Sequence, residues 1–405
     1  MTSPAPTEAL LHDLWAGQRF PASALVTRQG VPVRVLHRGR RGRGPGPDFR
    51  GAVIAGPSGL TLRGDVELHV RASEFRAHGH HRDPAYDGVI LHVVFEDDVG
   101  ADTTLRCGRS VPVVALAPWV SRREGEIERW LARPALWLEP CHDAPERLGP
   151  EGLASALDAL GDARFERRAA ALREAAGRDG PEQALYAAYL EALAYGGDRD
   201  AMRALARRLP WGEALRLLGG DRAALASLFL RSAGSLCERG ARPRRGRPHN
   251  DPARRLEGLA VLLARSGGPA RLAASAAEAS GPEGAIGAFV ARAGGGPALI
   301  GRSRAIELLV NAALPFLAGA GEGRLADAAR SLYRRLPRPG RYGALAFLEA
   351  QLRRPGAPAV TARRQQGLLA LHREWCAAGG CGRCPLSPPL REPAPRQEAP
   401  AARRR

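Results

Sequence analysis

The pattern of apolar and polar residues divides the chain into two regions with different periodicities. In the first 120 residues, short stretches with strand patterns alternate with brief helical ones. Residues 6–17 place apolar side chains at helical spacing behind Thr7, a suitable N-cap. Strands are predicted at 31–36, 49–54, 61–70 and 89–95, with a short helix at 72–78 and a last strand pair within 105–116. This order predicts an α/β domain over residues 1–120.

The strand at 61–70 carries different chemistry on its two faces. A strand sends successive side chains to opposite faces, so alternate residues share one side. Its polar face holds Asp65, Glu67 and His69, and its apolar face holds Val66, Leu68 and Val70. Asp48 begins the neighbouring strand, which a Gly-rich turn joins to this one. Carboxylates on adjacent strands could hold a divalent cation, so Asp48 and Glu67 are candidate metal ligands, with His69 beside them.

Beyond residue 120 the composition shifts to Ala, Leu and Arg, and the apolar residues follow the 3.6-residue period of helices. Residues 121–365 are therefore predicted to form a larger all-α domain. A cysteine-rich metal-binding segment is predicted at 366–386, and a disordered tail rich in Pro, Ala and Arg at 387–405. The fold class expected for the whole chain is α+β.

Charge changes this picture by suggesting a partner. The chain of 405 residues has a formal net charge of +18, with arginine supplying all 60 of its basic residues, which favours a polyanionic partner such as nucleic acid. No run of eighteen apolar residues occurs, and the N-terminus lacks the pattern of a signal peptide. We therefore expect no membrane association and a cytoplasmic location. The oligomeric state is left open.

Two clusters of arginine are candidate contacts for a phosphate backbone. The first lies just before Asp48 and the second lies within the helical region; an exposed, solvated loop is the alternative for both. The candidate nucleic-acid-binding residues are Arg38, Arg40, Arg41, Arg43, Arg242, Arg244, Arg245 and Arg247.

The cysteines near the C-terminus form the most specific local motif. Cys376, Cys381 and Cys384 lie within nine residues and are separated by glycines that would let the backbone wrap around an ion. The fourth ligand would be His372, one helical turn earlier, or Cys141. The former favours zinc, and the latter suits zinc or an iron–sulfur cluster. Reduced free thiols are the alternative, and Cys107 and Cys237 are expected to be ordinary core residues.

Histidines supply further candidate ligands. Residues 78–83 contain three histidines in a polar stretch, where solvated side chains are the alternative to metal binding. His92 is the one polar residue inside the strand at 89–95, where it is either a hydrogen-bonded core residue or part of a site.

The order of elements in the first region, with Asp48 opening the second strand and Glu67-Leu68-His69 in the third, resembles the core of the PD-(D/E)xK nuclease superfamily. The resemblance implies a restriction-endonuclease-like core that binds Mg²⁺ or Mn²⁺ through Asp48, Glu67 and the Leu68 carbonyl. It implies an additional ligand role for Glu8, whose alternative is a carboxylate that stabilises the start of its helix. His69 stands where the superfamily has lysine, and this departure leaves open whether catalysis is retained.

A second resemblance extends over almost the whole chain. Gly46-Pro47-Asp48-Phe49, Val66-Glu67-Leu68-His69, the stretch at 89–94 and the terminal cysteines resemble an uncharacterised bacterial family. It implies no activity. The functional hypotheses are therefore a metal-dependent nuclease or its inactive relative, a non-catalytic nucleic-acid-binding or scaffold protein with a structural metal, and a zinc-dependent small-molecule hydrolase that uses the histidines around His78 and His92.

Overall fold

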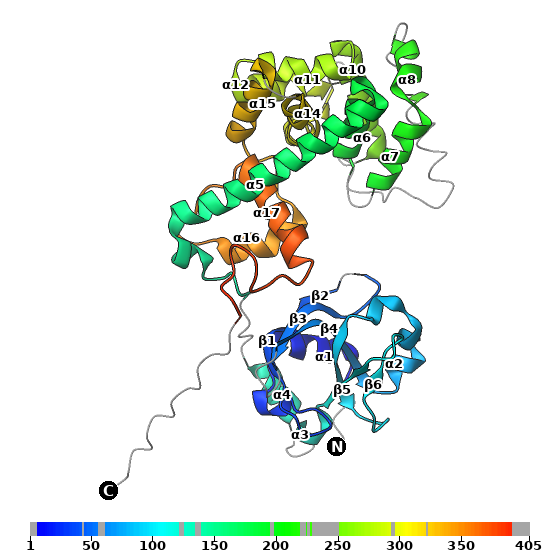
Figure 1. Ribbon diagram of the computed structural model, residues 1–405, viewed down its shortest axis with the longest axis vertical. Helices are drawn as coiled ribbons and strands as arrows, with labels where there is room; N and C mark the ends of the chain where they lie inside the picture. Colours follow the sequence, from blue (N-terminus) through cyan, green and yellow to red (C-terminus); the bar gives the residue numbers. More distant parts are fainter. Residues whose placement is uncertain are drawn as a thin grey trace. The chain divides into compact units, whose positions relative to one another are not determined.

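A mixed sheet forms the centre of the first of two units into which the chain folds (Figure 1). This unit comprises residues 1–149, 347–355 and 371–405, and the second comprises residues 150–346 and 356–370. The computed structural model describes residues 6–42, 44–55, 61–120, 125–133, 139–194, 198–218, 224, 227–228, 251–292, 296–320 and 323–390. The chain is α+β, with the sheet near its N-terminus and a larger helical region after it.

The central sheet combines antiparallel and parallel pairs in the order β1-β3-β4-β5-β8. β3 (Phe49–Ala55) pairs antiparallel with β1 (Arg34–His37) and with β4 (Thr61–Arg71). β5 (Val89–Glu96) then runs parallel to β4, and β8 (Val113–Ala115) runs parallel to β5. A short strand, β2 (Arg40–Arg41), also pairs with β3. The four strands predicted between residues 31 and 95 are confirmed, with ends that differ by at most three residues.

Helix α1 (Glu8–Gly17) covers one face of the sheet. The predicted cap is confirmed, because the side chain of Thr7 accepts a hydrogen bond from the Leu10 amide. The buried face of α1 shares a hydrophobic cluster with the apolar residues of β3 and β4, among them Leu11, Leu14, Trp15, Phe49, Val66 and Leu68. Since Val66 and Leu68 point toward α1, strand alternation sends Glu67 and His69 to the opposite face.

A second small core lies on that opposite face. α2 (Glu74–Ala77) buries Phe75 against Tyr86 and Val89, together with Leu105 and Val111. Tyr86 comes from a 3₁₀ turn at Pro84–Tyr86, and Val111 from β7 (Ser110–Val111), which forms a two-stranded ribbon with β6 (Thr103–Thr104). Glu67 and His69 are therefore buried polar residues at 3% and 1% exposure.

The cysteine-bearing segment belongs to the unit of the sheet. The predicted helix at 360–376 divides into α17 (Ala362–Ala370), in the helical unit, and a π-helical turn at Leu371–Cys376. Beyond it, Gly379 approaches Gly51 of β3 so closely that a Cβ on Gly51 would lie 2.4 Å from the Gly379 Cα. Both glycines have positive φ, so neither position accommodates a side chain.

Further helical elements belong to the same unit. They are α3 (Ala117–Val120), α4 (Glu126–Ala132), the first turns of α5 and α16 (Ala346–Leu352). The start of the predicted tail is packed, because the Gly382 amide donates to Ser387 Oγ at 2.7 Å. The tail beyond Leu390 lies outside the described residues.

The second unit consists mainly of helices, drawn in green to gold in Figure 1. They are α5 (Ala144–Asp179, which enters this unit at Pro150 after a break at Gly149), α6 (Pro181–Ala192), α7 (Arg199–Arg208), α8 (Trp211–Leu218), α10 (Pro252–Ser266), α11 (Pro269–Glu278), α12 (Gly281–Ala288), α13 (Arg302–Leu308), α14 (Leu314–Gly319), α15 (Arg324–Arg335) and α17. A π-helical segment at Leu309–Ala313 joins α13 to α14.

The all-α prediction for this region needs one correction. The predicted helix at 283–293 ends at Ala288, and a short ribbon follows, formed by β9 (Ala291–Arg292) and β10 (Ala298–Ile300). The run of glycines at 294–296 favours a chain reversal over helix continuation.

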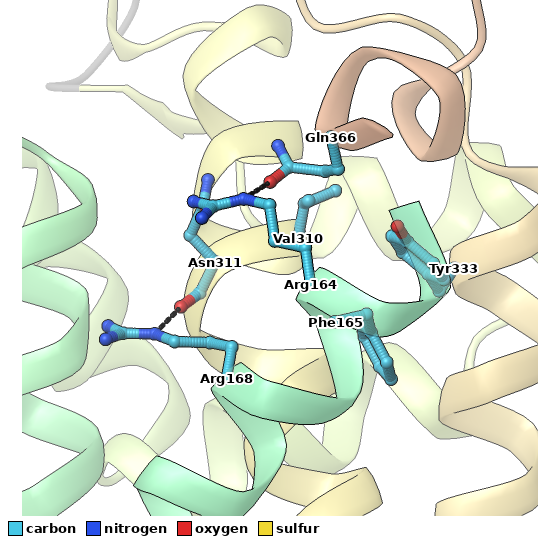
Figure 2. Close-up of a pocket in the computed structure, with 7 residues that line it drawn as sticks. All are labelled: Arg164, Phe165, Arg168, Val310, Asn311, Tyr333 and Gln366. Carbon is cyan, nitrogen blue, oxygen red and sulfur yellow. Dashed lines mark hydrogen bonds between the residues drawn. The ribbon is translucent and has the colours of Figure 1, made fainter. Parts of the chain in front are cut away.

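A small cavity lies among the helices of the second unit (Figure 2). Arg164 donates to the Gln366 side chain at 2.7 Å, and Arg168 donates to the Asn311 carbonyl at 3.0 Å. The cavity measures about 10 Å³, which is the space of a single water molecule. It is too small for a substrate. No helix among the described residues combines the length and the apolar composition needed to cross a membrane.

Candidate metal-binding site on the sheet

Asp48 and Glu67 lie together where β3 and β4 meet. The main-chain N–H of Asp48 donates to Glu67 Oε2 at 3.0 Å, and the N–H of Leu68 donates to Asp48 Oδ2 at 3.0 Å. Each carboxylate is thus held by the backbone of the neighbouring strand. His69 Nε2 lies 3.7 Å from the other oxygen of Glu67, Oε1. Asp48, Glu67 and His69, which the sequence singles out as catalytic candidates, are therefore neighbours.

Helix α1 brings two more groups to Asp48. Glu8, His12 and Asp48 have potential ligand atoms within 4.8 Å of one another. His12 Nε2 lies 3.1 Å from Asp48 Oδ1, and Arg41 donates to His12 Nδ1 at 3.1 Å. Because a guanidinium can only donate, His12 Nδ1 is an acceptor and a neutral His12 carries its proton on Nε2, facing Asp48. The fourth catalytic candidate, Glu8, therefore also lies beside Asp48, and it is exposed.

Three histidines approach Glu67 from the other side. His69, His78 and His80 have ring nitrogens within 4.8 Å of one another, and His80 Nε2 lies 3.5 Å from Glu67 Oε1. Behind them, His92 is fully buried and its Nε2 lies 2.9 Å from His69 Nδ1. His92 is thus a hydrogen-bonded core residue, as one of its two alternatives predicts, and its partner His69 is a candidate site residue.

Burial sets the protonation of these groups in the absence of a cation. Burial, reinforced by the negative charge of Asp48, raises the pKa of Glu67 to about 9. Burial, with the neighbouring imidazoles of His92 and His80, lowers the pKa of His69 to about 2. His69 is therefore neutral at physiological pH and does not carry the fixed positive charge that a lysine would bring to its position.

A basic cleft opens near these residues in the same unit. It encloses about 560 Å³ and is lined by Arg50, Arg63, Arg109 and Arg383, together with Asp65 and glycines of β3 and β4. Asp65 lies where the pairing of β4 with β5 shifts register, and its Oδ1 accepts a hydrogen bond from the Gly51 amide at 2.9 Å. The charges of Glu67, Asp48 and Arg50 all act on Tyr86, whose pKa is raised chiefly by burial. Tyr86 is therefore close enough to both carboxylates and to Arg50 for their charges to act on it.

The arginines selected from the sequence have other partners. Arg38 and Arg40 face Glu139, with their side chains only 19% and 18% exposed, and Arg40 also covers the ring of Phe347 at 4.2 Å. Arg41 is more exposed and lies 3.7 Å from Asp13, beside His12. Arg43, Arg242, Arg244, Arg245 and Arg247 lie outside the described residues. Among the described arginines of the first cluster, Arg41 contacts His12, which in turn lies beside Asp48.

The cysteines gather in a second place in this unit. Cys141, Cys376 and Cys381 are buried, and Cys384 is half-buried. The charges of Cys381 and Cys384 contribute to raising the pKa values of Cys141 and Cys376, chiefly raised by burial, which indicates that these thiols are near one another. Cys381 also has potential ligand atoms of His37 and Glu139 within 4.8 Å. Of the two candidates for a fourth ligand, Cys141 is near enough for the charges of Cys384 and Cys381 to act on it. The ring of His372 lies against Phe347 at an interplanar angle of 56°, with ring centroids 5.8 Å apart. The core prediction for Cys107 is wrong, because Cys107 is exposed in the turn between β6 and β7; Cys237 lies outside the described residues.

Sequence patterns alone missed several of these contributors. His12 looks like an ordinary polar position of α1, and its i+4 spacing from Glu8 is the signal that could have placed both on one face. His37, Glu139 and Tyr86 have no local motif. Each is brought to its site by packing between segments that are distant in the sequence.

Comparison with known proteins identifies the family but no activity. Residues 8–243, more than half of the chain, match the sequence profile of a family described as "Protein of unknown function (DUF2851)". Comparison with curated proteins and with solved structures gave no significant match. The chain therefore belongs to this family of proteins of unknown function.

Proposed function

We propose that the chain is a metal-dependent phosphodiesterase that cleaves nucleic acid. The observation that carries the proposal is the pair of hydrogen bonds that joins the two segments: the Asp48 N–H donates to the Glu67 carboxylate, and the Leu68 N–H donates to the Asp48 carboxylate. Glu8 lies beside Asp48, and His69 lies beside Glu67. The buried carboxyl group of Glu67 is costly to ionise near the half-buried carboxylate of Asp48, as its raised pKa indicates, and a divalent cation would remove that cost. The donor set therefore fits Mg²⁺ or Mn²⁺, the ions implied by the nuclease resemblance.

The order and direction of the elements support the same proposal. α1 precedes three antiparallel strands (β1, β3 and β4), and α2 then leads to β5, which is parallel to β4. This is the order on which the resemblance to the PD-(D/E)xK superfamily rests. Asp48 directly precedes β3 and Glu67 lies within β4, as that resemblance requires.

Each side chain can be given a part in hydrolysis. Asp48 and Glu67 would hold the cation, which supplies an activated water and stabilises the charge that develops on the phosphate. Glu8 can add a carboxylate oxygen from α1. Neutral His69 can accept or donate one hydrogen bond but cannot attract phosphate by charge. That attraction falls to Arg41 and to the basic cleft.

The basic cleft supports a nucleic acid as the substrate. Arg50, Arg109 and Arg383 are exposed, and Arg63 donates to the Cys381 carbonyl at 2.8 Å. Guanidinium groups around an open cleft suit a chain of phosphates, because each can form paired hydrogen bonds with phosphate oxygens. The arginines of the cleft would therefore bind phosphate in place of Arg38 and Arg40, because these two arginines are paired with Glu139.

We also infer that the cysteines hold zinc or an iron–sulfur cluster with a structural role. The charges of the C-terminal thiols Cys381 and Cys384 act on Cys141, from a distant part of the sequence, and on Cys376. Four cysteines would be a ligand set for either group. The Arg63 bond to Cys381 and the contact of Gly379 with Gly51 attach this segment to the sheet that carries Asp48 and Glu67. A metal here would fasten the C-terminal segment to the sheet.

A nicking assay tests the proposed activity. Supercoiled plasmid and single-stranded RNA are incubated with the purified protein and Mn²⁺ or Mg²⁺, and with the variants Asp48→Asn and Glu67→Gln. We expect cleavage by the wild type and a loss of at least about a hundredfold in both variants, since each removes a charged ligand. The exposed Asp200→Asn variant is the control and should retain full activity.

Two outcomes would contradict the proposal. Cleavage that survives in both variants would exclude a role for these carboxylates. Hydrolysis of bis(4-nitrophenyl) phosphate without cleavage of either nucleic acid would favour a small-molecule hydrolase.

A further inference from the structure

We propose that His69, His78 and His80, with Glu67, bind a transition-metal ion of the zinc class. The ring nitrogens of the three histidines lie within 4.8 Å of one another. The Glu67 Oε1 atom lies 3.5 Å from His80 Nε2 and 3.7 Å from His69 Nε2. Three imidazoles and one carboxylate form a ligand set typical of zinc, whereas Mg²⁺ prefers oxygen ligands.

His69 Nε2 is the clearest sign of a missing partner. The His69 side chain is 1% exposed, and within the described part of the chain this nitrogen is buried without a hydrogen-bond partner. An unsatisfied buried polar atom costs about 1–3 kcal/mol, so such atoms are rare unless a ligand completes them. Glu67 Oε1 lies 3.7 Å from it, and His69, His78 and His80 form one group of potential ligands.

The surrounding hydrogen bonds orient His69 for this role. His69 Nδ1 lies 2.9 Å from His92 Nε2, and His92 Nδ1 lies 2.8 Å from Thr103 Oγ1. If His69 Nδ1–H donates to His92, and His92 Nδ1–H donates to Thr103, the lone pair of His69 Nε2 points toward the other ligands. A hydrogen-bond relay of this kind commonly supports a metal-bound histidine.

The loop after α2 presents the other two histidines. Gly79, between His78 and His80, has a φ of 79°, a left-handed conformation that suits glycine and reverses the chain between the two rings. His80 stacks on Tyr86 with ring centroids 4.0 Å apart, which restricts its orientation. His78 is exposed, so an ion can enter from the solvent side.

Glu67 links this group to the proposed catalytic carboxylates. Its Oε1 faces the histidines, while its Oε2 accepts the Asp48 N–H. The inference therefore deepens the proposed function, on which it rests for the role of the neighbouring ion. One carboxylate would serve two adjacent cations, an arrangement that stabilises both the attacking and the leaving oxygen in phosphoester hydrolysis.

Metal content provides a test that does not depend on activity. The full-length protein and its variants are stripped with a chelator, reloaded with Zn²⁺, desalted and measured by elemental analysis. His78→Asn and His80→Ala should each bind about one zinc fewer per chain than the wild type. His81→Ala is the matched control, because His81 is in the same loop but accepts a hydrogen bond from Arg82 and is not in the ligand group.

Reloading with Co²⁺ adds a spectroscopic readout. The difference in visible absorption between the wild type and His80→Ala should show a nitrogen- and oxygen-ligated ion, without the sulfur-to-metal charge transfer expected from the cysteines. Wild-type zinc content in both His78→Asn and His80→Ala, with circular dichroism unchanged, would overturn the inference. Failure of the proposed function is seen separately, as cleavage that survives Asp48→Asn.

Discussion

Asp48 and Glu67 hold each other in place through the main chain. The Asp48 N–H donates to the Glu67 carboxylate, and the Asp48 carboxylate accepts the N–H of Leu68, both at 3.0 Å. Since Asp48 directly precedes β3 and Leu68 follows Glu67 in β4, the pairing register of the two strands fixes the separation of the carboxylates. A change in that register would separate them, whatever side chains they carry.

The first prediction concerns the pH dependence of stability in the metal-free protein. Burial raises the pKa of Glu67 from 4.5 to about 9, so between these values the folded state keeps a proton that the unfolded chain loses. Stability should therefore fall as pH rises from about 4.5 to about 9, by at most about 1.4 kcal/mol per pH unit from this group. Below that range both states are protonated and the effect disappears.

Urea unfolding of chelator-treated protein at pH 6, 7 and 8 measures this slope. His37, whose pKa is raised to about 9 by Cys381 and Glu139 against the effect of burial, also loses a stabilising contribution as pH rises. The Glu67 share is isolated by Glu67→Gln, which should have a shallower slope than wild type and than the exposed Glu278→Gln control. Parallel slopes for all three proteins would show that Glu67 is not protonated in the folded state.

The second prediction concerns the thiols. Because metal binding contributes to folding, Cys376→Ser and Cys381→Ser should each lower the melting temperature by roughly 5 °C or more. A chelator should lower the wild-type value toward that of the variants and change the variants little. Cys107→Ser, which alters an exposed thiol outside the cluster, should behave like the wild type. A protein that purifies without zinc or iron, and whose melting does not respond to chelator, would contradict a metal at the cysteines.

The third prediction concerns the basic cleft. Binding of duplex DNA releases counterions, so the logarithm of affinity falls with the logarithm of salt concentration by about 0.9 for each phosphate contacted. Replacing Arg50, Arg109 and Arg383 with Gln should weaken binding at low salt and reduce this slope by up to about 2.7. Arg63 is left intact because it holds the cysteine segment.

The control for the cleft changes the net charge equally at another place. Arg207, Arg208 and Arg334 are exposed on helices of the second unit, and they are replaced together with Gln. This variant should keep the wild-type slope. Equal losses in the two triple variants, measured by fluorescence anisotropy, would mean that net charge alone attracts the nucleic acid.

The fourth prediction concerns the contact of two glycines. A Cβ on Gly379 would lie 2.7 Å from the Gly51 Cα, and the φ of Gly379 is 64°. Gly379→Ala should therefore cost about 2–4 kcal/mol through steric overlap and backbone strain, and should speed the alkylation of Cys381. The control is Gly30→Ala, because Gly30 has a φ of 82° and open space around it. This variant has backbone strain without steric overlap, so it should lose only about 1 kcal/mol of folding stability. Similar costs and unchanged alkylation rates in both variants would show that the glycine contact does not hold the segment.

Local patterns predicted the elements because their causes are local. Alternation in β4 placed Glu67 and His69 on one face, helical spacing placed α1, and Thr7 marked its start. The sequence patterns did not predict the π-helical turn at Leu371–Cys376 or the ribbon of β9 and β10. Packing and glycine-rich connections override the average helical period at these places. Arg38 and Arg40 were assigned to phosphate because the sequence contains no sign that Glu139 would face them.

The sequence by itself determined the mixed α+β class, the face of β4 that carries the polar residues, and the residue types able to hold metal ions. Only the tertiary structure decided which of these groups meet. Strand register brought Asp48 to Glu67, and the turn at Gly79 directed His78 and His80 toward His69. Packing in the first unit also gathered Cys141 with the C-terminal cysteines and formed the basic cleft from separated arginines. Periodicity reports the surroundings of each residue along its own element, whereas a site depends on distances between elements that periodicity does not encode.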